Sequence, residues 1–280
     1  MRVRVVLMLL LTIALSALLG PPPDPRFLLS KVAELVLRAK LRDAGSVDVD
    51  VEAPSLLSGR VDRVRVRGQR WCTPLSLSCR SLDLSVRSTA IDFGALIGRQ
   101  RIELIKPALG AATISFTEAD FANFLAHPLM TEAVARHARR VPPPQGFAFG
   151  RAVRMLPPGD AVAGAAGAVT FPVTCNAAAA DGRPTVLLMQ QAAGGSIIVQ
   201  RLSAGSPEDA EAAATCRWIA SLFAGLLIDL DGCALTFQSM RFVASAPQTF
   251  PSAGKTSGAV ELELDLHVRV TSFPSLSLKF

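Results

Sequence analysis

The most constraining feature of this chain is a strict alternation of apolar and polar residues near its C-terminal end. From Val260 to Val270 every second residue is Val or Leu, and the residues between them are Glu, Asp, His or Arg. A period of two is that of a β-strand with one buried face, and it excludes a helix of the same composition. At roughly 3.3 Å per residue this strand would be about 36 Å long, which exceeds the usual strand. The fold must therefore supply something for a long apolar face to cover.

Similar alternation recurs earlier in the chain, for example over residues 47–52. In two places the alternation shifts by one residue, so that the apolar residues change from odd to even positions. The apolar side chains would then point to the wrong face of the sheet unless the strand contains one extra residue. We therefore expect β-bulges at Arg80 or Ser81 and again between Phe237 and Met240. Because bulges bend strands, the pattern predicts a strongly curved antiparallel sheet.

Sequence patterns typical of helices occur between the predicted strands. Pro25 opens a helix expected to run to about Asp43, and its apolar stripe packs under the sheet or, alternatively, lies on a bilayer surface. Thr117 is expected to cap a short helix, and Pro128 to start another. The stripe of the first helix comprises Leu28, Val32, Leu35, Val36 and Ala39.

The back half of the chain carries weaker signals. Short apolar runs separated by turn residues predict a meander of strands over residues 147–200. Ser206 and Pro207 then supply a cap and a first-turn proline for a helix that is expected to end near Leu227. Together these elements predict an α+β fold, organised as a single domain over residues 24–280.

Composition narrows the classes of partner. Half of the residues are apolar and the net charge is +6, which suits an anionic partner such as a phospholipid headgroup. The chain has no Tyr and only two Trp, so it lacks the aromatic platforms that hold single-stranded nucleic acid, and we expect no nucleic-acid partner. The excess apolar surface must face a core or a ligand.

Residues 1–20 resemble an export signal, with Arg2 and Arg4 before an apolar run that prolines follow. The run is short for a transmembrane helix, although an uncleaved anchor is the alternative. We expect an exported, membrane-associated protein of the cell envelope, periplasm or secretory lumen, or of a plastid if the host is photosynthetic.

The sequence contains few residue patterns that would indicate a disulfide, a metal site or a catalytic site. The five cysteines are either small buried residues or, for Cys72 and Cys79, a bridge across a turn. No zinc-ligand spacing is present, so we expect no metal and no cofactor. Asp229 and Asp231, two residues apart, are the candidates if the protein is an enzyme acting on an envelope lipid. No nucleophile or phosphate-binding motif supports that reading, so we assign no catalytic residue.

A basic stripe on one predicted strand is the most notable charge feature. Arg63, Arg65 and Arg67 share a strand face and could grip phosphates as a row of guanidiniums. The alternative is an ordinary solvated face, because an amphipathic strand requires alternate polar residues.

Several segments resemble the LmeA-type family of phospholipid-binding proteins. They are residues 58–66, Leu82-Asp83-Leu84, and residues 112–121 with their Thr-Glu-x-Asp helix start. The resemblance covers residues 47–125 best and 228–273 more loosely. It implies an exported, membrane-associated lipid binder of tubular (TULIP-like) architecture, in which a highly curved antiparallel sheet wraps an amphipathic N-terminal helix and leaves an apolar groove.

The expected function is to bind a phospholipid or related amphiphile in the groove at a membrane, with transfer or storage of that lipid as alternatives. A membrane-tethered scaffold protein is a further alternative. Arg63, Arg65 and Arg67 are the candidate headgroup contacts. The candidate groove residues are Leu28, Val32, Leu35, Val64, Val66, Leu75, Leu77, Leu82, Leu84, Val86, Phe116, Phe121, Phe124, Phe237, Phe242, Leu262, Leu264 and Leu266.

Overall fold

A computed structural model describes most of the chain: residues 25–53, 60–90, 103–157, 167–175, 184–192, 195–202, 210–230, 232–244 and 260–272. It is an α+β protein, as expected. The helices are α2 (Pro25–Arg38), α4 (Glu118–Leu125), α5 (Pro128–Ala138) and α6 (Ala210–Ala224). The strands are β1 (Ser46–Glu52), β2 (Arg60–Cys72), β3 (Ser78–Ala90), β4 (Glu103–Phe116), β5 (Ala148–Phe149), β6 (Arg154–Leu156), β7 (Ala168–Thr174), β8 (Thr185–Gln191), β9 (Ile197–Arg201), β10 (Leu227–Asp229), β11 (Cys233–Ala244) and β12 (Val260–Ser272).

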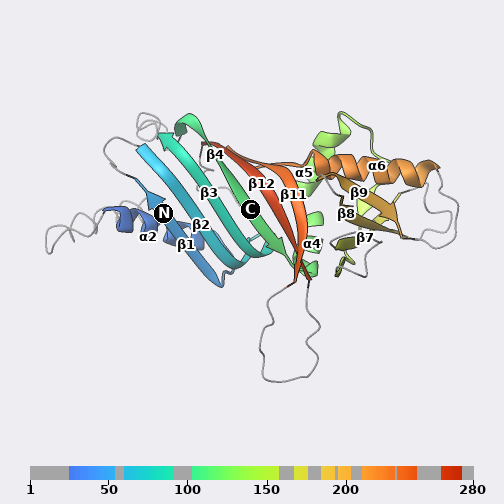
Figure 1. Ribbon diagram of the computed structural model, residues 1–280, viewed down its shortest axis with the longest axis horizontal. Coiled ribbons are helices and arrows are strands. Elements are labelled where there is room, and N and C mark those ends of the chain that lie inside the picture. Colours follow the sequence, from blue (N-terminus) through green and yellow to red (C-terminus); the bar gives the residue numbers. More distant parts are fainter. Residues whose placement is uncertain are drawn as a thin grey trace, which may run out of the picture.

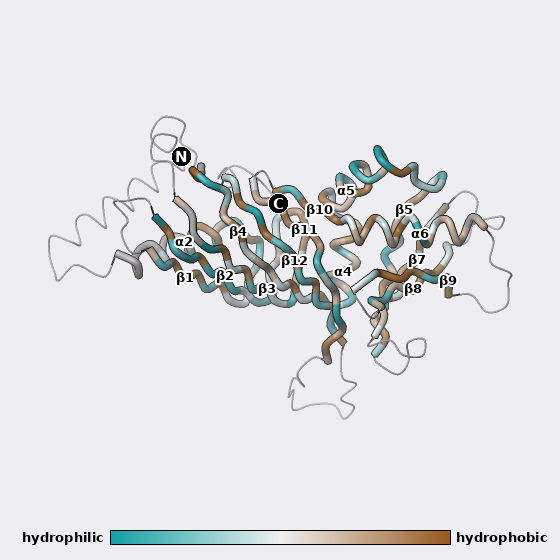
Figure 2. Tube along the Cα trace, turned by 45° about the horizontal axis from the view of Figure 1, so that its top comes forward, coloured by the Kyte–Doolittle hydropathy of each residue, from teal (hydrophilic) through white to brown (hydrophobic). Residues whose placement is uncertain are grey.

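A large curved sheet dominates the molecule (Figure 1). Its seven strands are all antiparallel, in the order β1-β2-β3-β4-β12-β11-β10. The alternating strand predicted from Val260 to Val270 is β12, which pairs with β4 on one side and β11 on the other. Hydropathy alternates along these strands (Figure 2), so the sheet has one apolar and one polar face.

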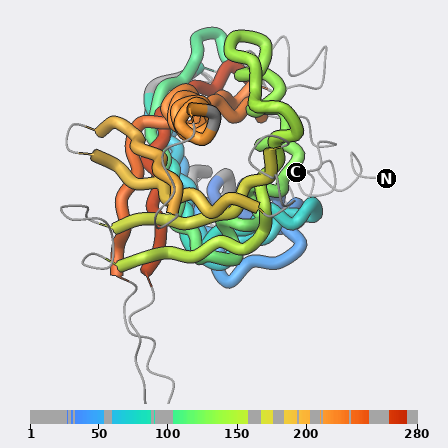
Figure 3. Tube along the Cα trace, turned by 90° about the vertical axis from the view of Figure 1, so that its right-hand side faces the viewer, coloured from blue at the N-terminus to red at the C-terminus, as the bar shows by residue number. Residues whose placement is uncertain are grey.

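A smaller sheet and three helices lie at one end of the large sheet. The smaller sheet has five strands in the order β5-β7-β8-β9, with β6 also paired to β7, which confirms the predicted meander. Helix α6 packs against β9 and is seen end-on above the smaller sheet in Figure 3. The predicted cap of this helix lies outside the described residues. Helix α2 lies at the opposite end, beside β1 (Figure 1).

The two expected phase changes occur by different means. In β11 the register shifts between Phe237 and Ser239, which confirms the predicted bulge. Between β2 and β3 the pairing skips Arg70 and Arg80 and then resumes in the same register, so no residue is gained on either strand. Instead Arg70 adopts a left-handed conformation with φ of 52°. The face to which the apolar side chains point therefore changes on β2 and β3 at the same place, without a bulge.

Helix α2 meets the sheet by a different stripe from the expected one. Ala33 and Leu37 of the helix, with Leu41 beyond its end, pack against the smaller core at β1, and the backbone N–H of Val51 donates to Ser30 Oγ at 3.1 Å. Leu35, which the expected stripe would bury, is 54% exposed. The helix ends at Arg38, earlier than predicted. Wrapping of the sheet around this helix stays a prediction.

The described residues bury two separate hydrophobic cores. The larger core fills the space between the apolar face of β4, β12 and β11 and the layer formed by α4, α5, α6 and the smaller sheet. Phe121, which is fully buried, lies in an aromatic cluster with Phe116, Phe124 and Phe223. The smaller core joins β1 to α2. The apolar face of the sheet is thus covered at both ends by different elements.

Candidate functional site

Between the two cores, the apolar face of the sheet is only half covered. The half-buried side chains there are Val64 and Val66 of β2, Leu82 and Leu84 of β3, and Ile114 of β4; we call these five residues the central band. The register makes them one surface, because Val66 pairs with Leu84 and Leu82 pairs with Ile114.

The central band lies between the two cores and contacts both of them. Its β2 members contact the smaller core, and Leu84 and Ile114 contact the larger one. Among the described residues, Leu82 belongs to neither core. A row of apolar side chains that folding leaves partly exposed is a feature of interaction sites.

Trp71 covers one end of the central band. Its indole lies over Gly68, where a Cβ atom would come within 1.9 Å of the ring nitrogen. The indole N–H donates to the carbonyl oxygen of Ser46 at 2.7 Å, which holds the ring against the strands. Since Gly68 pairs with Leu82, the ring borders the band directly.

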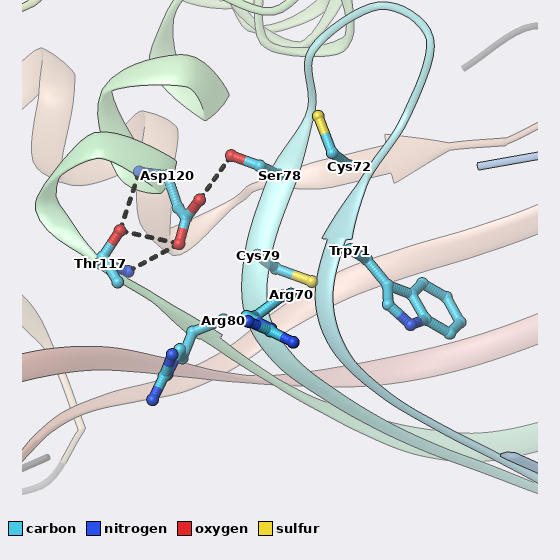
Figure 4. Close-up of a pocket in the computed structure, with 8 residues that line it drawn as sticks. All are labelled: Arg70, Trp71, Cys72, Ser78, Cys79, Arg80, Thr117 and Asp120. Carbon is cyan, nitrogen blue, oxygen red and sulfur yellow. Dashed lines mark hydrogen bonds between the residues drawn. The ribbon is translucent and has the colours of Figure 1, made fainter. Parts of the chain in front are cut away.

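A pocket of about 220 Å³ lies beyond Trp71, near the turn between β2 and β3 (Figure 4). Ligand pockets usually measure about 300 to 1,000 Å³, so this one is too small for a whole phospholipid. Its lining residues are Arg70, Trp71, Cys72, Ser78, Cys79, Arg80, Thr117 and Asp120.

The acidic residue of this pocket, Asp120, accepts hydrogen bonds from neighbouring protein groups. Asp120 accepts hydrogen bonds from Ser78 Oγ at 2.5 Å, from the backbone N–H of Thr117 at 3.1 Å and from Thr117 Oγ1 at 2.8 Å. Thr117 in turn accepts from the backbone N–H of Asp120, which completes the capping box of α4. Glu118 accepts from the backbone N–H of Met155 at 2.8 Å. The Thr-Glu-x-Asp segment therefore ties α4 to β3 and β6.

The thiols near the pocket are not set up as nucleophiles. Burial, with a smaller contribution from Asp120, raises the pKa of Cys79 to about 12, so its thiol stays protonated at neutral pH. Cys72 pairs with Ser78 and Cys79 pairs with Trp71 in the ladder, and the two thiols point in different directions (Figure 4). No disulfide joins Cys72 to Cys79, so the bridge between them is not formed.

The predicted headgroup arginines lie on the polar face of the sheet, opposite the central band. Arg63 pairs with Glu52, Arg65 with Asp83 at 2.6 Å, and Arg67 with Asp48 at 2.8 Å. The hydrogen bonds from Arg65 hold the pKa of Asp83 below its ordinary value. Each carboxylate belongs to a neighbouring strand, so the basic stripe forms cross-strand ion pairs. A role of these arginines in headgroup binding stays a prediction.

The predicted groove residues fall into groups by burial. Leu35 and Leu75 are exposed, and the side chains of Leu28 and Val32 lie outside the described part of the chain. Those buried in the larger core are Val86, Phe116, Phe121, Phe124, Phe237, Leu262, Leu264 and Leu266. Those half-buried are Val64, Val66, Leu77, Leu82, Leu84 and Phe242.

Sequence reasoning missed two residues of this surface, Ile114 and Trp71. The alternation of β4 could have indicated Ile114, since Ala112 and Phe116 share its phase. The isolated Gly68 within a strand pattern was a signal of close approach by another group, which is Trp71.

Candidate catalytic groups do not converge. Asp229 is exposed at the end of β10, and Asp231 lies outside the described residues, so that pair stays a prediction. A contact of 3.0 Å joins His137 Nε2 to Ser221 Oγ, but the serine hydroxyl donates to the carbonyl oxygen of Trp218. This contact links α5 to α6. Within the described ranges no three His, Cys, Asp or Glu residues are placed to hold a metal ion.

The site is thus a partly covered apolar band on a curved antiparallel sheet, bordered by Trp71. Comparison with known families gives the class of protein. The family model described as LmeA-like phospholipid-binding matches residues 26–246, well over half of the chain. The chain therefore belongs to the LmeA-like phospholipid-binding family. Searches of curated proteins and of solved structures return no match.

Proposed function

We propose that this protein binds a phospholipid or related amphiphile at a membrane, with an acyl chain lying along the central band. The observation that carries the proposal is the central band around Leu82, where apolar side chains of three adjacent strands are only partly buried between the two cores. The family supports a phospholipid as the ligand. The buried phenylalanines are packed in the larger core, so the lipid contact is assigned to the half-buried residues alone.

The energetics favour an acyl chain on this surface. A buried methylene group contributes about 0.8 kcal/mol, so a stretch of about ten such groups would contribute about 8 kcal/mol if fully buried. One side of a chain on the central band would remain covered only by water or membrane, which reduces this to about half. Such moderate retention suits a protein that takes up and releases lipid, and we extend the proposal to transfer between membranes.

None of the helices among the described residues is both long and apolar enough to cross a bilayer. The predicted signal or anchor at residues 1–20 lies outside them. Binding of the protein to a membrane is therefore part of the proposal. Its support from the sequence is the predicted export signal.

The proposal is tested at Leu82. Native mass spectrometry of the purified protein should detect bound phospholipid, and the delipidated protein should take up a fluorescent phospholipid. Leu82→Gln places an amide on the band and should weaken uptake about tenfold, because the amide loses water under an acyl chain. Leu82→Met keeps an apolar side chain of similar volume and should bind as the wild type does.

The matched control is Ala111→Gln, which adds the same amide to the polar face of β4, where Ala111 is exposed. It should leave uptake unchanged. Protein that carries no lipid and takes up none would contradict the proposal, and so would equal losses in Leu82→Gln and Ala111→Gln.

A further inference from the structure

The turn between β2 and β3, residues 73–77, presents an apolar side chain to solvent. Leu75 is 48% exposed at this turn, and its neighbours Pro74 and Ser76 are exposed as well. The turn is closed by hydrogen bonds from the backbone N–H of Thr73 to the Leu77 carbonyl at 2.8 Å and from the backbone N–H of Leu77 to Thr73 Oγ1 at 3.1 Å. This closed turn holds Leu75 outward instead of letting it fold back onto the sheet.

One basic side chain contacts the same turn, and a second lies further back on β2. Arg42, in the segment after α2, donates to Ser76 Oγ at 3.2 Å and to Cys72 Sγ at 2.9 Å, and it remains exposed. Arg70, at the end of β2, is also exposed. Asp43 is the exposed acid beside them. An outward leucine beside the Arg42 guanidinium, with the Arg70 guanidinium further back over Gly45, suits a surface that is apolar inside and anionic outside. This is the character of a bilayer containing acidic phospholipids.

The turn is also continuous with the central band. The strands that lead into it carry Val64 and Val66 on β2 and Leu82 and Leu84 on β3, with Trp71 between these residues and the turn. Trp is a side chain that often lies at the boundary between membrane and water, because its ring is apolar and its N–H is polar. A lipid leaving a bilayer at this turn would reach the band without crossing the sheet.

A second exposed apolar site exists on the other face of the sheet. Leu109 of β4 is 64% exposed, and it pairs with Arg87 and Arg269 on the neighbouring strands. This site resembles the turn in chemistry, since each has an exposed leucine near arginine side chains. It lies on the polar face, however, so a lipid entering there would have to pass through or around the sheet to reach the band.

We propose that the turn at residues 73–77, through Leu75, Arg42 and Arg70, is the surface by which the protein docks on an anionic phospholipid bilayer. The inference rests on the proposed function, since it assigns the membrane contact for the same lipid site. It commits to a lipid surface as the partner and not to another protein.

Flotation with vesicles tests the docking surface. The probe is a vesicle of phosphatidylglycerol and phosphatidylcholine in equal parts, compared with pure phosphatidylcholine. Leu75→Ser should weaken partition into the mixed vesicles about fivefold to tenfold, because the leucine side chain no longer enters the bilayer. Arg70→Gln should weaken it about fivefold on mixed vesicles and have little effect on neutral ones.

The matched controls come from the other face. Leu109→Ser and Arg87→Gln make the same chemical changes at exposed positions and should alter partition by less than about twofold. Loss of partition in Leu109→Ser, with Leu75→Ser unchanged, would overturn the proposal in favour of the polar face. Absence of vesicle binding by the wild type, with or without capture of a protein partner, would also overturn it.

Lipid occupancy separates this test from that of the proposed function. Native mass spectrometry of Leu75→Ser should show the same bound lipid as the wild type, because the central band is intact. A wild type that carries no lipid yet floats with vesicles through Leu75 would contradict the carrier function and leave the docking surface standing.

Discussion

At the scale of single residues, the end of the central band depends on one glycine and one tryptophan. The indole of Trp71 occupies the space that any side chain at position 68 would need. The alternation of Val64 and Val66 predicts that position 68 shares their face, but it does not show which side chain lies above it. The left-handed backbone of Arg70, two residues later, reorients the chain there, and a strand pattern gives no sign of such a change.

Gly68→Ala should lower the free energy of unfolding by about 1 to 3 kcal/mol, because the new methyl group displaces the indole. In a double-mutant cycle, Trp71→Ala should remove most of that cost, so the double variant should be more stable than the sum of the two single effects predicts. Urea unfolding of the wild type, the two single variants and the double variant measures these free energies. Additive effects would mean that the ring does not lie on Gly68.

At the scale of elements, the start of α4 joins parts of the chain that are distant in sequence. Thr117 was predicted to cap this helix, and the structure confirms it with a full capping box. The bond from Ser78 to Asp120 could not be predicted, because it depends on how β3 lies beside the end of β4. Likewise, the basic stripe of β2 was visible in the sequence, but its carboxylate partners are set by strand register.

Asp120→Ala should destabilise the fold by about 1 to 3 kcal/mol, since it leaves Ser78 and the first turn of α4 without their acceptor. Glu132→Ala, at an exposed position of α5, is the control and should change stability by less than about 0.5 kcal/mol. Thermal or urea unfolding compares the two. Equal small effects would show that the Thr-Glu-x-Asp segment does not hold β3 to α4.

At the scale of the whole molecule, the sequence predicts the sheet well and its covering poorly. Alternation predicted the strands from residue 47 onward, the bulge in β11 and the long β12, because burial of one face imposes a period of two. It could not separate residues packed in the larger core, such as Phe121, from half-covered ones, such as Leu82. Both are apolar, and what covers them is decided by helices placed by tertiary contacts.

The partly covered central band is therefore the feature on which the functional account depends. Two cores at either end of one continuous apolar face leave its middle to be covered by something other than the described part of the chain. A ligand of the length and polarity of an acyl chain fits that surface better than a small polar molecule.

The most direct measurement is photo-crosslinking with a phospholipid that carries a diazirine in its acyl chain, followed by peptide mapping. The account predicts adducts on β2, β3 and β4 at Val64, Val66, Leu82, Leu84 or Ile114. Adducts confined to the polar face, as at Leu109, or to the smaller sheet and α6, would contradict it.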